Sequence, residues 1–385
     1  MMKKKAAVLG STGSVGTQVL DVCDKLGADV AFIAARSNIE LLLKQIKKFK
    51  PEYVAVTYTD AADKLKSQIS GDTKLIKGYD ATCIAIEEFD CDIVFNAVSG
   101  KNGLLPTLSV IRSGKTLALA NKESMVLAGP IVNAEAKKHN ATILPVDSEH
   151  CAIFQCLKNG KKSEVKRILL TASGGPFFGY TYDQLERVSL EDTMKHPTWN
   201  MGKKITVDSA TLANKGLEII EAMHLFDVPY DKIKVLIHRQ SIVHSMVEYN
   251  DNSVIAQLAV PDMRHPGQYA LTYPDRVDGV INELDLTKYT LTFNEPDEEA
   301  FKMLPLARFC AKAGGIMPCV YNAANEAAVD LFLKKSIGFN DIYRICEYVI
   351  SSTDNAPLSD IEQIIEEDKK ARELAYSYKE KLNHK

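Results

Sequence analysis

Residues 5–26 read KAAVLGSTGSVGTQVLDVCDKL. A short apolar run is followed by glycines at Gly10, Gly13 and Gly16 and then by apolar residues at helical spacing, which predicts a strand, a glycine loop and a helix. In dinucleotide-binding proteins such glycines let the backbone approach a pyrophosphate, whose charge then lies at the helix N-terminus. The GxxGxxG spacing is a variant of that fingerprint, and an ordinary tight turn is the alternative interpretation.

The alternation of strand and helix patterns continues after this first unit. Further apolar runs, each expected to be a strand, occupy residues 29–34, 53–57, 92–97, 116–120 and 142–146. Strands that alternate with amphipathic helices predict a doubly wound parallel sheet, which binds its ligand beyond the carboxyl ends of the strands. We therefore expect a Rossmann-like nucleotide-binding domain at residues 1–146.

The end of the second expected strand bears on the choice of cofactor. NAD-binding proteins place an Asp or Glu there, where it accepts the ribose 2′-hydroxyl. This chain has Arg36, Ser37 and Asn38 instead. A cation and a hydroxyl suit the 2′-phosphate of NADP, whereas a solvated loop cation is the alternative interpretation of Arg36.

Two carboxylates, Asp147 and Glu149, follow the apolar run 142–146. They could supply two oxygen ligands to Mg²⁺ or Mn²⁺, with a third ligand from elsewhere. A solvated turn or a helix cap is the alternative. Lys122, which follows the run 116–120, could hold a substrate oxygen or belong to a helix N-terminus capped by Asn121.

Polar residues beyond this point fit an anionic substrate. Ser173 and the two glycines after it offer a hydroxyl and open amides to a phosphate, although the same pattern is found in ordinary turns. Asn214, Lys215 and Glu218 would share one face of a helix. They could hold a phosphate and complete a metal site, or they could form a solvated helix face.

The single tryptophan of the chain, Trp199, lies in a polar segment between Pro197 and Gly202, where core packing would not usually place it. A lid near residues 195–204 that closes an aromatic ring over a ligand explains this position. A partly exposed ring that covers an apolar patch is the alternative.

The predicted fold class is α/β. The N-terminal doubly wound NADP-binding domain is followed by a central α+β catalytic domain (147–275) with a mostly antiparallel sheet, by a connector (276–298), and by a C-terminal α-helical bundle (299–385). The sheet is expected within residues 234–260, where His238 and His244 are expected to be hydrogen-bonded structural groups.

Composition narrows the classes of partner. Lys and Arg number 47 against 50 Asp and Glu, which gives a net charge of −3 and no basic excess for a nucleic acid. No apolar run approaches the roughly 20 residues that cross a bilayer, so no membrane association is expected. The eight cysteines are scattered without CxxC pairs, which indicates reduced thiols in the cytoplasm.

In combination, these motifs resemble the 1-deoxy-D-xylulose 5-phosphate reductoisomerase family over nearly the whole chain. The resemblance rests on GSTGSVG (10–16), ANKES (120–124), PVDSEH (145–150), ASGGPF (172–177), HPTWNMGKKITVDSATLANKGLE (196–218), QLAVPDMRHPGQYAL (257–271) and NAANEAAV (322–329). It implies an NADPH-dependent and Mg²⁺- or Mn²⁺-dependent enzyme, usually a homodimer, that converts a small phosphorylated sugar to 2-C-methyl-D-erythritol 4-phosphate in non-mevalonate isoprenoid synthesis.

The resemblance also implies roles for individual residues. Those at cofactor positions are Thr12, Gly13, Ser14, Val15, Arg36, Ser37, Asn38, Asn121, Glu123 and Gly202. Those at metal positions are Asp147, Glu149 and Glu218, which with Lys122 form the expected catalytic set. Those at the substrate phosphate are Ser173, Ser209, Asn214 and Lys215, and other substrate positions are Lys122, Ser148, His196 and the lid residue Trp199. The family often has Gly before the basic residue near the 2′-phosphate, so the pattern leaves open whether Arg36 or Ser37 meets it.

Two other functions remain open from the residues alone. An NADP-dependent semialdehyde or acyl-phosphate reductase also opens with such a glycine loop, and it would need a nucleophile such as Cys151 beside His150. A nucleotide-sensing binding protein without turnover is the second alternative.

The roles assigned to Asp147, Ser148 and Glu149 also require a particular backbone conformation. In a strand, Ser148 would point away from Asp147 and Glu149, so the chain is expected to turn into a helix there if all three face a substrate.

Overall fold

The computed structural model describes residues 4–69, 71–199 and 201–382. By their contacts, the residues fall into two compact units, each made of several stretches of chain. The first unit contains residues 1–124, 130–151 and 262–283, and the second contains residues 125–129, 152–261 and 284–385.

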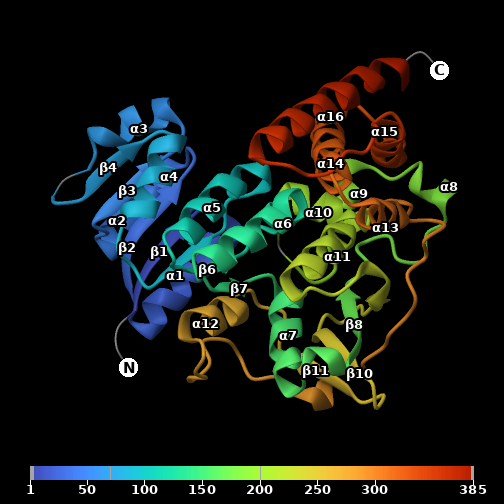
Figure 1. Ribbon diagram of the computed structural model, residues 1–385, viewed down its shortest axis with the longest axis horizontal. Coiled ribbons are helices and arrows are strands. Elements are labelled where there is room, and N and C mark those ends of the chain that lie inside the picture. Colours follow the sequence, from blue (N-terminus) through green and yellow to red (C-terminus); the bar gives the residue numbers. More distant parts are fainter. Residues whose placement is uncertain (1–3, 70, 200, 383–385) are drawn as a thin grey trace. The chain divides into compact units, whose positions relative to one another are not determined.

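The first unit is built on a seven-stranded parallel sheet of order β4-β3-β2-β1-β5-β6-β7 (Figure 1). The strands are β1 (Lys5–Leu9), β2 (Asp29–Ala35), β3 (Tyr53–Val56), β4 (Lys74–Lys77), β5 (Ile93–Asn96), β6 (Thr116–Leu119) and β7 (Ile143–Pro145). Successive strands run outward from β1 to one edge and then from β5 to the other. This order confirms the doubly wound fold, with a change of direction beside the glycine loop.

Helices connect these strands. They are α1 (Ser14–Leu26), α2 (Ile39–Phe49), α3 (Thr59–Lys66), α4 (Tyr79–Glu88), the 3₁₀ turn η1 (Gly100–Gly103), α5 (Leu104–Arg112) and α6 (Lys122–Lys138). The central strands are buried on both faces, because Ala6, Ala7 and Val8 of β1 have no exposed surface. That burial explains why they read as continuous apolar runs. The sequence did not predict β4, an edge strand whose KLIK sequence is only half-buried.

A distant segment completes the first unit. Helix α12 (Arg264–Thr272) packs on α1, and the Gly267 position lies within van der Waals distance of Val19 and Val22. Arg264 forms ion pairs with Asp262 and with Asp21, the latter at 3.1 Å. These contacts place residues 262–283 with the nucleotide-binding fold, which differs from the expected boundary of 147–275.

The second unit contains a four-stranded sheet of order β11-β10-β8-β9. Its strands are β8 (Val165–Ala172), β9 (Ile233–Ile237), β10 (Val243–Tyr249) and β11 (Val254–Leu258). β10 pairs with β8 and with β11 in antiparallel fashion, which confirms the mostly antiparallel sheet. β8 and β9 are parallel, so the residues that follow these two strands meet at one edge of the sheet.

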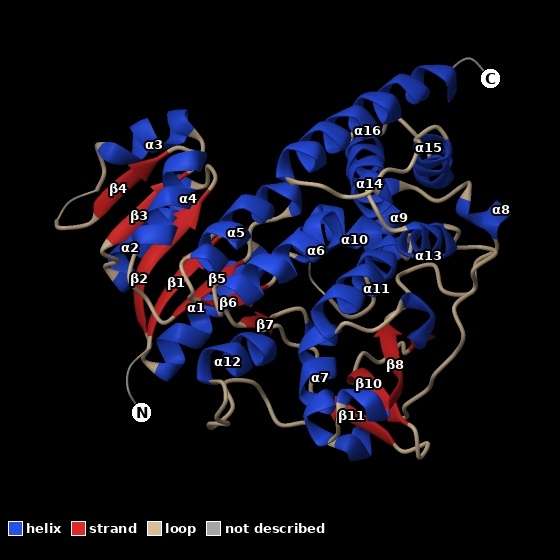
Figure 2. Cartoon of the chain, viewed as in Figure 1, coloured by secondary structure: helices blue, strands red, loops and turns tan. Residues whose placement is uncertain are grey.

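The rest of the second unit is helical (Figure 2). Its helices are α7 (Ser148–Cys156, which begins in the first unit), α8 (Tyr182–Leu185), α9 (Leu190–Thr193), α10 (Lys203–Ala210), α11 (Ala213–Phe226), α13 (Met303–Ala313), α14 (Met317–Leu333), α15 (Phe339–Ser351) and α16 (Ile361–Leu382). Short 3₁₀ turns are η2 (Leu157–Asn159), η3 (Lys162–Glu164), η4 (Tyr230–Lys232) and η5 (Leu286–Lys288).

Close packing fixes the orientation of α11. A Cβ at Gly216 would lie 2.4 Å from the Cβ of Ala307 on α13, so only a glycine allows these helices to come this close. The buried Tyr321 of α14 lies against the same position. Among the described residues, no helix combines the length and the apolar character needed to cross a membrane.

Candidate active site

The glycine loop after β1 has the shape of a phosphate cradle. Gly10 has a φ of +78°, and a Cβ there would lie 2.5 Å from the carbonyl oxygen of Ala97. A Cβ at Gly16 would lie 2.2 Å from the carbonyl oxygen of Gly10. The loop between them, with Gly13 and Ser14 exposed, begins α1 without a side-chain cap. Its backbone amides are therefore placed to bind an anion at the helix N-terminus.

The three polar residues after β2 lie exposed at the carboxyl end of the sheet. Oδ1 of Asn38 accepts a hydrogen bond from the Leu41 amide at 3.2 Å and caps α2. Arg36 and Ser37 precede this cap. The position of all three beyond a strand end suits a cofactor contact.

Asn121 is the N-cap of α6, as one of the two interpretations of this segment expected. Its Oδ1 accepts from the amide of Ser124 at 2.9 Å, while its Nδ2 donates to the carbonyls of Val98 and Gly100 and to the Glu123 carboxylate at 2.7–3.0 Å. The side chain therefore braces the loop after β5. A contact of Asn121 with a cofactor would have to use its backbone.

Asp147 organises the start of α7. Helix α7 begins at Ser148, so the chain turns into a helix where the assigned site requires it. Oδ1 of Asp147 accepts hydrogen bonds from the amides of Glu149 (3.0 Å) and His150 (3.3 Å). Oδ2 of Asp147 forms an ion pair with Nζ of Lys122 at 2.9 Å, and both side chains are almost buried. The Ser148 hydroxyl donates to the Glu149 carboxylate.

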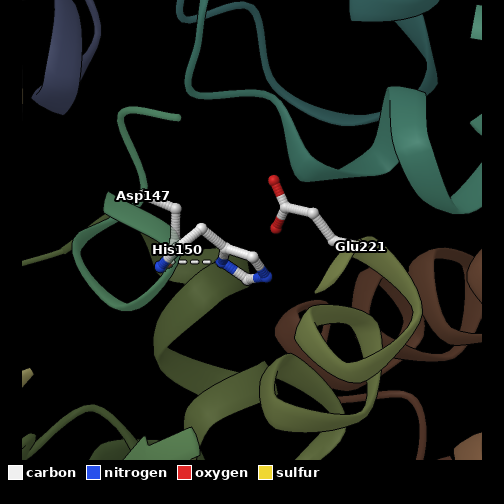
Figure 3. A group of neighbouring side chains, drawn as sticks. All are labelled: Asp147, His150 and Glu221. Carbon is white, nitrogen blue, oxygen red and sulfur yellow. Dashed lines mark hydrogen bonds and ion pairs between the residues drawn. The ribbon is translucent and has the colours of Figure 1, made fainter. Parts of the chain in front are cut away.

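His150 supports the Asp147 carboxylate, a role that the sequence did not predict. Its Nδ1 lies 3.0 Å from Oδ1 of Asp147, and the side chain is fully buried (Figure 3). Such a hydrogen bond orients a carboxylate that binds a metal. The spacing of three residues between Asp147 and His150 at a helix start was the available signal.

Cys151, the nucleophile that the competing reductase needs, is 1% exposed inside α7. A thiol buried in this way is not placed to attack a substrate.

Helix α11 carries the polar set expected in the second unit. Asn214 and Lys215 both donate hydrogen bonds to the carboxylate of Glu218, one turn further along the helix. Lys215 is 4% exposed and Glu218 is 1% exposed. The side chains therefore do not form a solvated helix face. Glu221, which Figure 3 labels, lies on the same helix and is also buried.

The glycines after β8 allow their loop to lie against α10. Gly174 and Gly175 have φ values of +76° and +63°. A Cβ at Gly175 would lie 2.9 Å from the carbonyl oxygen of Ser209, so a side chain there would push the loop away from α10. This close approach brings Ser173 and Ser209 to the same place.

His196 joins these two serines. Its Nε2 lies 3.0 Å from Oγ of Ser173 and 3.1 Å from Oγ of Ser209. Its Nδ1 accepts hydrogen bonds from the amides of Thr198 (3.3 Å) and Trp199 (3.0 Å). An Nδ1 that accepts places the proton of the neutral ring on Nε2, where it can be donated to a serine or to a bound anion.

Burial, and then the charge of Arg239, lower the pKa of His196 to about 4. We expect ¹⁵N NMR of the histidine rings to show His196 neutral with its proton on Nε2, and to show it titrating well below its ordinary value of 6.5. Because the folded-state pKa is the lower one, the unfolded chain takes up the proton first, so this group lowers stability as the pH falls from 6.5 to 4. An Nδ1–H tautomer or an ordinary pKa would contradict this arrangement.

Replacing Gly175 by Ala is expected to raise the KM for a phosphorylated substrate by about tenfold or more, because misplacing a binding group by about 1 Å has effects of this size or larger. Gly179→Ala is the matched control. Gly179 also has a positive φ, of +86°, but a Cβ there meets nothing within 4 Å. If both variants change KM equally, backbone strain and not contact with Ser209 is responsible.

The expected lid segment follows His196. Trp199 is half-buried, and its ring centroid lies 6.3 Å from that of His244 at an interplanar angle of 52°. Gly202 is the N-cap residue of α10, and its carbonyl accepts the Thr206 amide at 3.1 Å. Asn200, within the expected lid, lies outside the described residues.

A doubly wound sheet with an open glycine loop is typical of dinucleotide-dependent enzymes, and buried carboxylates and serine, histidine and lysine donors are the groups that bind metals and anionic substrates. Three family profiles match the chain. One described as 1-deoxy-D-xylulose 5-phosphate reductoisomerase matches residues 6–129, and two described as its C-terminal domains match residues 143–226 and 258–374. The chain belongs to the 1-deoxy-D-xylulose 5-phosphate reductoisomerase family.

Individual relatives are similar in sequence to this chain over nearly its full length. The reductoisomerase of Clostridium botulinum (strain Loch Maree) is 48% identical over 377 residues, which cover 96% of this chain and 98% of the relative. That of Thermoanaerobacter pseudethanolicus is 49% identical over 375 residues, with the same coverage.

Solved structures of reductoisomerases also have the same fold as this chain. The Zymomonas mobilis enzyme in complex with NADPH has a TM-score of 0.92, is 40% identical, and covers 98% of this chain and 100% of its own. A reductoisomerase in complex with NADPH, fosmidomycin and magnesium has a TM-score of 0.93 at 37% identity, with 99% coverage of both chains.

Proposed function

We propose that Asp147, Glu149 and Glu218 hold the divalent metal of this enzyme and that Lys122 acts beside them on the substrate. The chain catalyses the NADPH- and divalent-metal-dependent conversion of 1-deoxy-D-xylulose 5-phosphate to 2-C-methyl-D-erythritol 4-phosphate. Three carboxylates are the hard oxygen donors that Mg²⁺ and Mn²⁺ prefer, so the residues fit the group. The observation that carries the residue assignment is the fixed carboxylate of Asp147 at the start of α7, whose Oδ1 accepts hydrogen bonds from the amides of Glu149 and His150.

The cofactors supply the reactive chemistry: the metal, when bound, acidifies a substrate hydroxyl and polarises a carbonyl, and NADPH provides a hydride. The glycine cradle fits NADPH, because a Cβ at Gly10 or Gly16 would strike the backbone of Ala97 or of Gly10, so only glycines allow the tight loop that leaves Gly13 and Ser14 exposed. The open backbone at Thr12–Val15 would bind that pyrophosphate. Arg36, Ser37 and Asn38 would meet the 2′-phosphate, and Asn121, Glu123 and Gly202 would make other cofactor contacts.

The residues of the second unit would bind the substrate phosphate. Ser173, Ser209 and the Nε2–H of His196 offer donors at one place, and Lys215 and Asn214 offer a cation and an amide from α11. Phosphate groups favour such charge-assisted donors. Binding energy from this remote group would orient the sugar, with Ser148 at other substrate atoms and Trp199 closing over it as a lid.

One assay tests this function. Purified protein with Mg²⁺ or Mn²⁺ is expected to oxidise NADPH only when 1-deoxy-D-xylulose 5-phosphate is added, as followed at 340 nm, and EDTA is expected to abolish the reaction. Cys151→Ala is expected to retain most of the activity. Absence of NADPH oxidation under all metal conditions would overturn the enzyme assignment, and near-complete loss in Cys151→Ala would favour the competing reductase.

We also infer a homodimer that uses the second sheet. In the described part of the chain β11 is an edge strand that pairs only with β10, and Val254 on it is 45% exposed. On the same sheet, the buried Leu169, Val243 and Met246 pack against partly buried apolar residues that include Ala256 and Leu258 of β11. An edge strand with partly exposed apolar residues is typical of protein contacts. Sedimentation velocity would show a monomer if this inference is wrong.

For the location we propose the cytoplasm. All eight cysteines are buried and none forms a disulfide. Thiols that stay reduced are typical of proteins from that compartment.

A further inference from the structure

Arg239 lies at the edge of the second sheet where the proposed phosphate site is built. Because β8 and β9 are parallel with Ala172 opposite Ile237, the residues that follow the two strands are neighbours. The amide of His238 donates to the carbonyl of Ala172 at 2.7 Å. Ser173 follows β8 directly and Arg239 lies two residues beyond the end of β9, so both residues lie at the same edge of the sheet, although 65 other residues separate them in the chain.

The guanidinium of Arg239 holds the loop that carries Ser173. Its Nη1 donates to the carbonyl oxygen of Ser173 at 3.2 Å and to that of Gly175 at 2.5 Å. The guanidinium carbon also lies 5.2 Å from the centroid of the Phe178 ring. One side chain thus contacts both ends of the Ser173–Gly175 loop and Phe178, three residues further on.

The turn that bears Arg239 is itself fixed. Nε2 of the buried His238 accepts hydrogen bonds from the amides of Ile242 (3.2 Å) and Val243 (3.1 Å), and its Nδ1 lies 2.8 Å from the Thr292 carbonyl oxygen. His238 is therefore a structural histidine, as expected from the sequence. A residue on a turn held in this way has a defined direction before any ligand binds.

The charge of Arg239 is not balanced by a nearby acid. Across residues 4–69, 71–199 and 201–382, no Asp or Glu forms an ion pair with it, and burial lowers its pKa. Its guanidinium donates to the carbonyl of Ser173, whose Oγ lies 3.0 Å from Nε2 of His196, and its charge contributes to the lowered pKa of that histidine. A half-buried cation beside hydroxyls and a neutral imidazole favours a bound anion.

We propose that Arg239 is a positioning residue for the substrate phosphate, which it serves by holding the Ser173–Gly175 loop and by adding a positive charge to the site. The proposal rests on the assignment of Ser173, His196 and Ser209 to that phosphate. Arg239 acts by holding the loop and by its positive charge. A lysine would keep the charge, but its ammonium ends one bond short of the Nη1 that donates to both carbonyl oxygens.

The test compares Arg239→Gln with Arg239→Lys and with Lys234→Gln. Lys234 lies on β9, the strand that precedes Arg239, and forms an exposed ion pair with Glu295. Its removal therefore takes away one positive charge from that part of the chain without loss of a contact to the Ser173–Gly175 loop. Arg239→Gln is expected to raise the KM for 1-deoxy-D-xylulose 5-phosphate by about tenfold or more, with kcat and the KM for NADPH changed by less than about threefold. Arg239→Lys is expected to recover part of this loss, and Lys234→Gln is expected to match the unmodified chain.

A second measurement needs no turnover. Inorganic phosphate is expected to raise the melting temperature of the unmodified chain and of Lys234→Gln, and to raise that of Arg239→Gln by less than half as much. If the unmodified chain failed to turn over the sugar phosphate, the proposed function would fail while this measurement still tested Arg239.

Three outcomes would overturn the proposal for Arg239. The first is a change of KM in Arg239→Gln that is no larger than in Lys234→Gln. The second is a fall in kcat and a rise in both KM values by the same factor. The third is a phosphate-induced rise of the melting temperature in Arg239→Gln equal to that of the unmodified chain. If Arg239→Gln does not fold, the KM values of Arg239→Lys test the proposal instead. A KM for the sugar phosphate about threefold higher with an unchanged KM for NADPH supports the proposal, and no change in either overturns it.

Discussion

Replacing Glu218 by Gln is expected to weaken Mn²⁺ binding by about 100-fold or more, because losing a direct ligand should exceed the 10- to 100-fold effects seen for groups that only orient a ligand. The substitution keeps the shape of the side chain and removes its charge. Activity at saturating NADPH and sugar phosphate should then require correspondingly more metal. Titration of Mn²⁺ by electron paramagnetic resonance measures the affinity without turnover.

Glu221→Gln provides the comparison for this experiment. Both glutamates are buried on α11 and lie three residues apart, so the two variants lose the same charge from the same helix. Glu218 accepts hydrogen bonds from Asn214 and Lys215, which join it to the residues of the proposed phosphate site. Equal losses of Mn²⁺ affinity in the two variants would contradict the assignment of the ligand to Glu218.

Lys122→Met is expected to lower kcat but to strengthen Mn²⁺ binding, whereas Glu218→Gln weakens it. Loss of a group that binds the reacting substrate or assists proton transfer should lower kcat by about 100-fold. The Lys122 ammonium lies 2.9 Å from Oδ2 of Asp147, where it competes with a cation for that oxygen. Its removal should therefore tighten Mn²⁺ binding by about threefold, since like charges no longer repel.

Lys122→Arg serves as the control, because it keeps the positive charge beside Asp147. It is expected to leave Mn²⁺ affinity near that of the unmodified chain while kcat still falls. Weaker Mn²⁺ binding in Lys122→Met would show that the lysine serves only to hold Asp147 in place, and its catalytic assignment would then be withdrawn.

The parts of the fold that follow from local patterns were predictable. The central parallel strands are buried on both faces, so each reads as an apolar run, and the glycine loop marks the first of them. β4 has no such apolar run, because it is an edge strand whose residues are not buried on both faces of the sheet. The turn from β7 into α7 was predicted from the geometry that Asp147, Ser148 and Glu149 require.

The parts that depend on pairing between distant segments were not predictable. Arg239 lies beside Ser173 only because β8 and β9 are parallel neighbours, which no spacing in the sequence reveals. His150 was considered only as a partner for Cys151, yet the helix turn directs its ring to Asp147. Helix α12 packs on α1, and Arg264 pairs with Asp21 across 243 positions of the chain, a contact that no local pattern reveals.

Helix α12 packs on the N-terminal α1 but is synthesised much later than α1. The apolar side of α1 at Val19 and Val22 is synthesised early, but the helix that covers it lies within residues 262–283. As the chain leaves the ribosome, its N-terminal sheet must wait for about 240 further residues before that face is closed, and exposed apolar surface in such an interval favours aggregation. A fragment that ends near residue 146 would carry the same uncovered face permanently, so an isolated nucleotide-binding unit would need residues 262–283 joined to it.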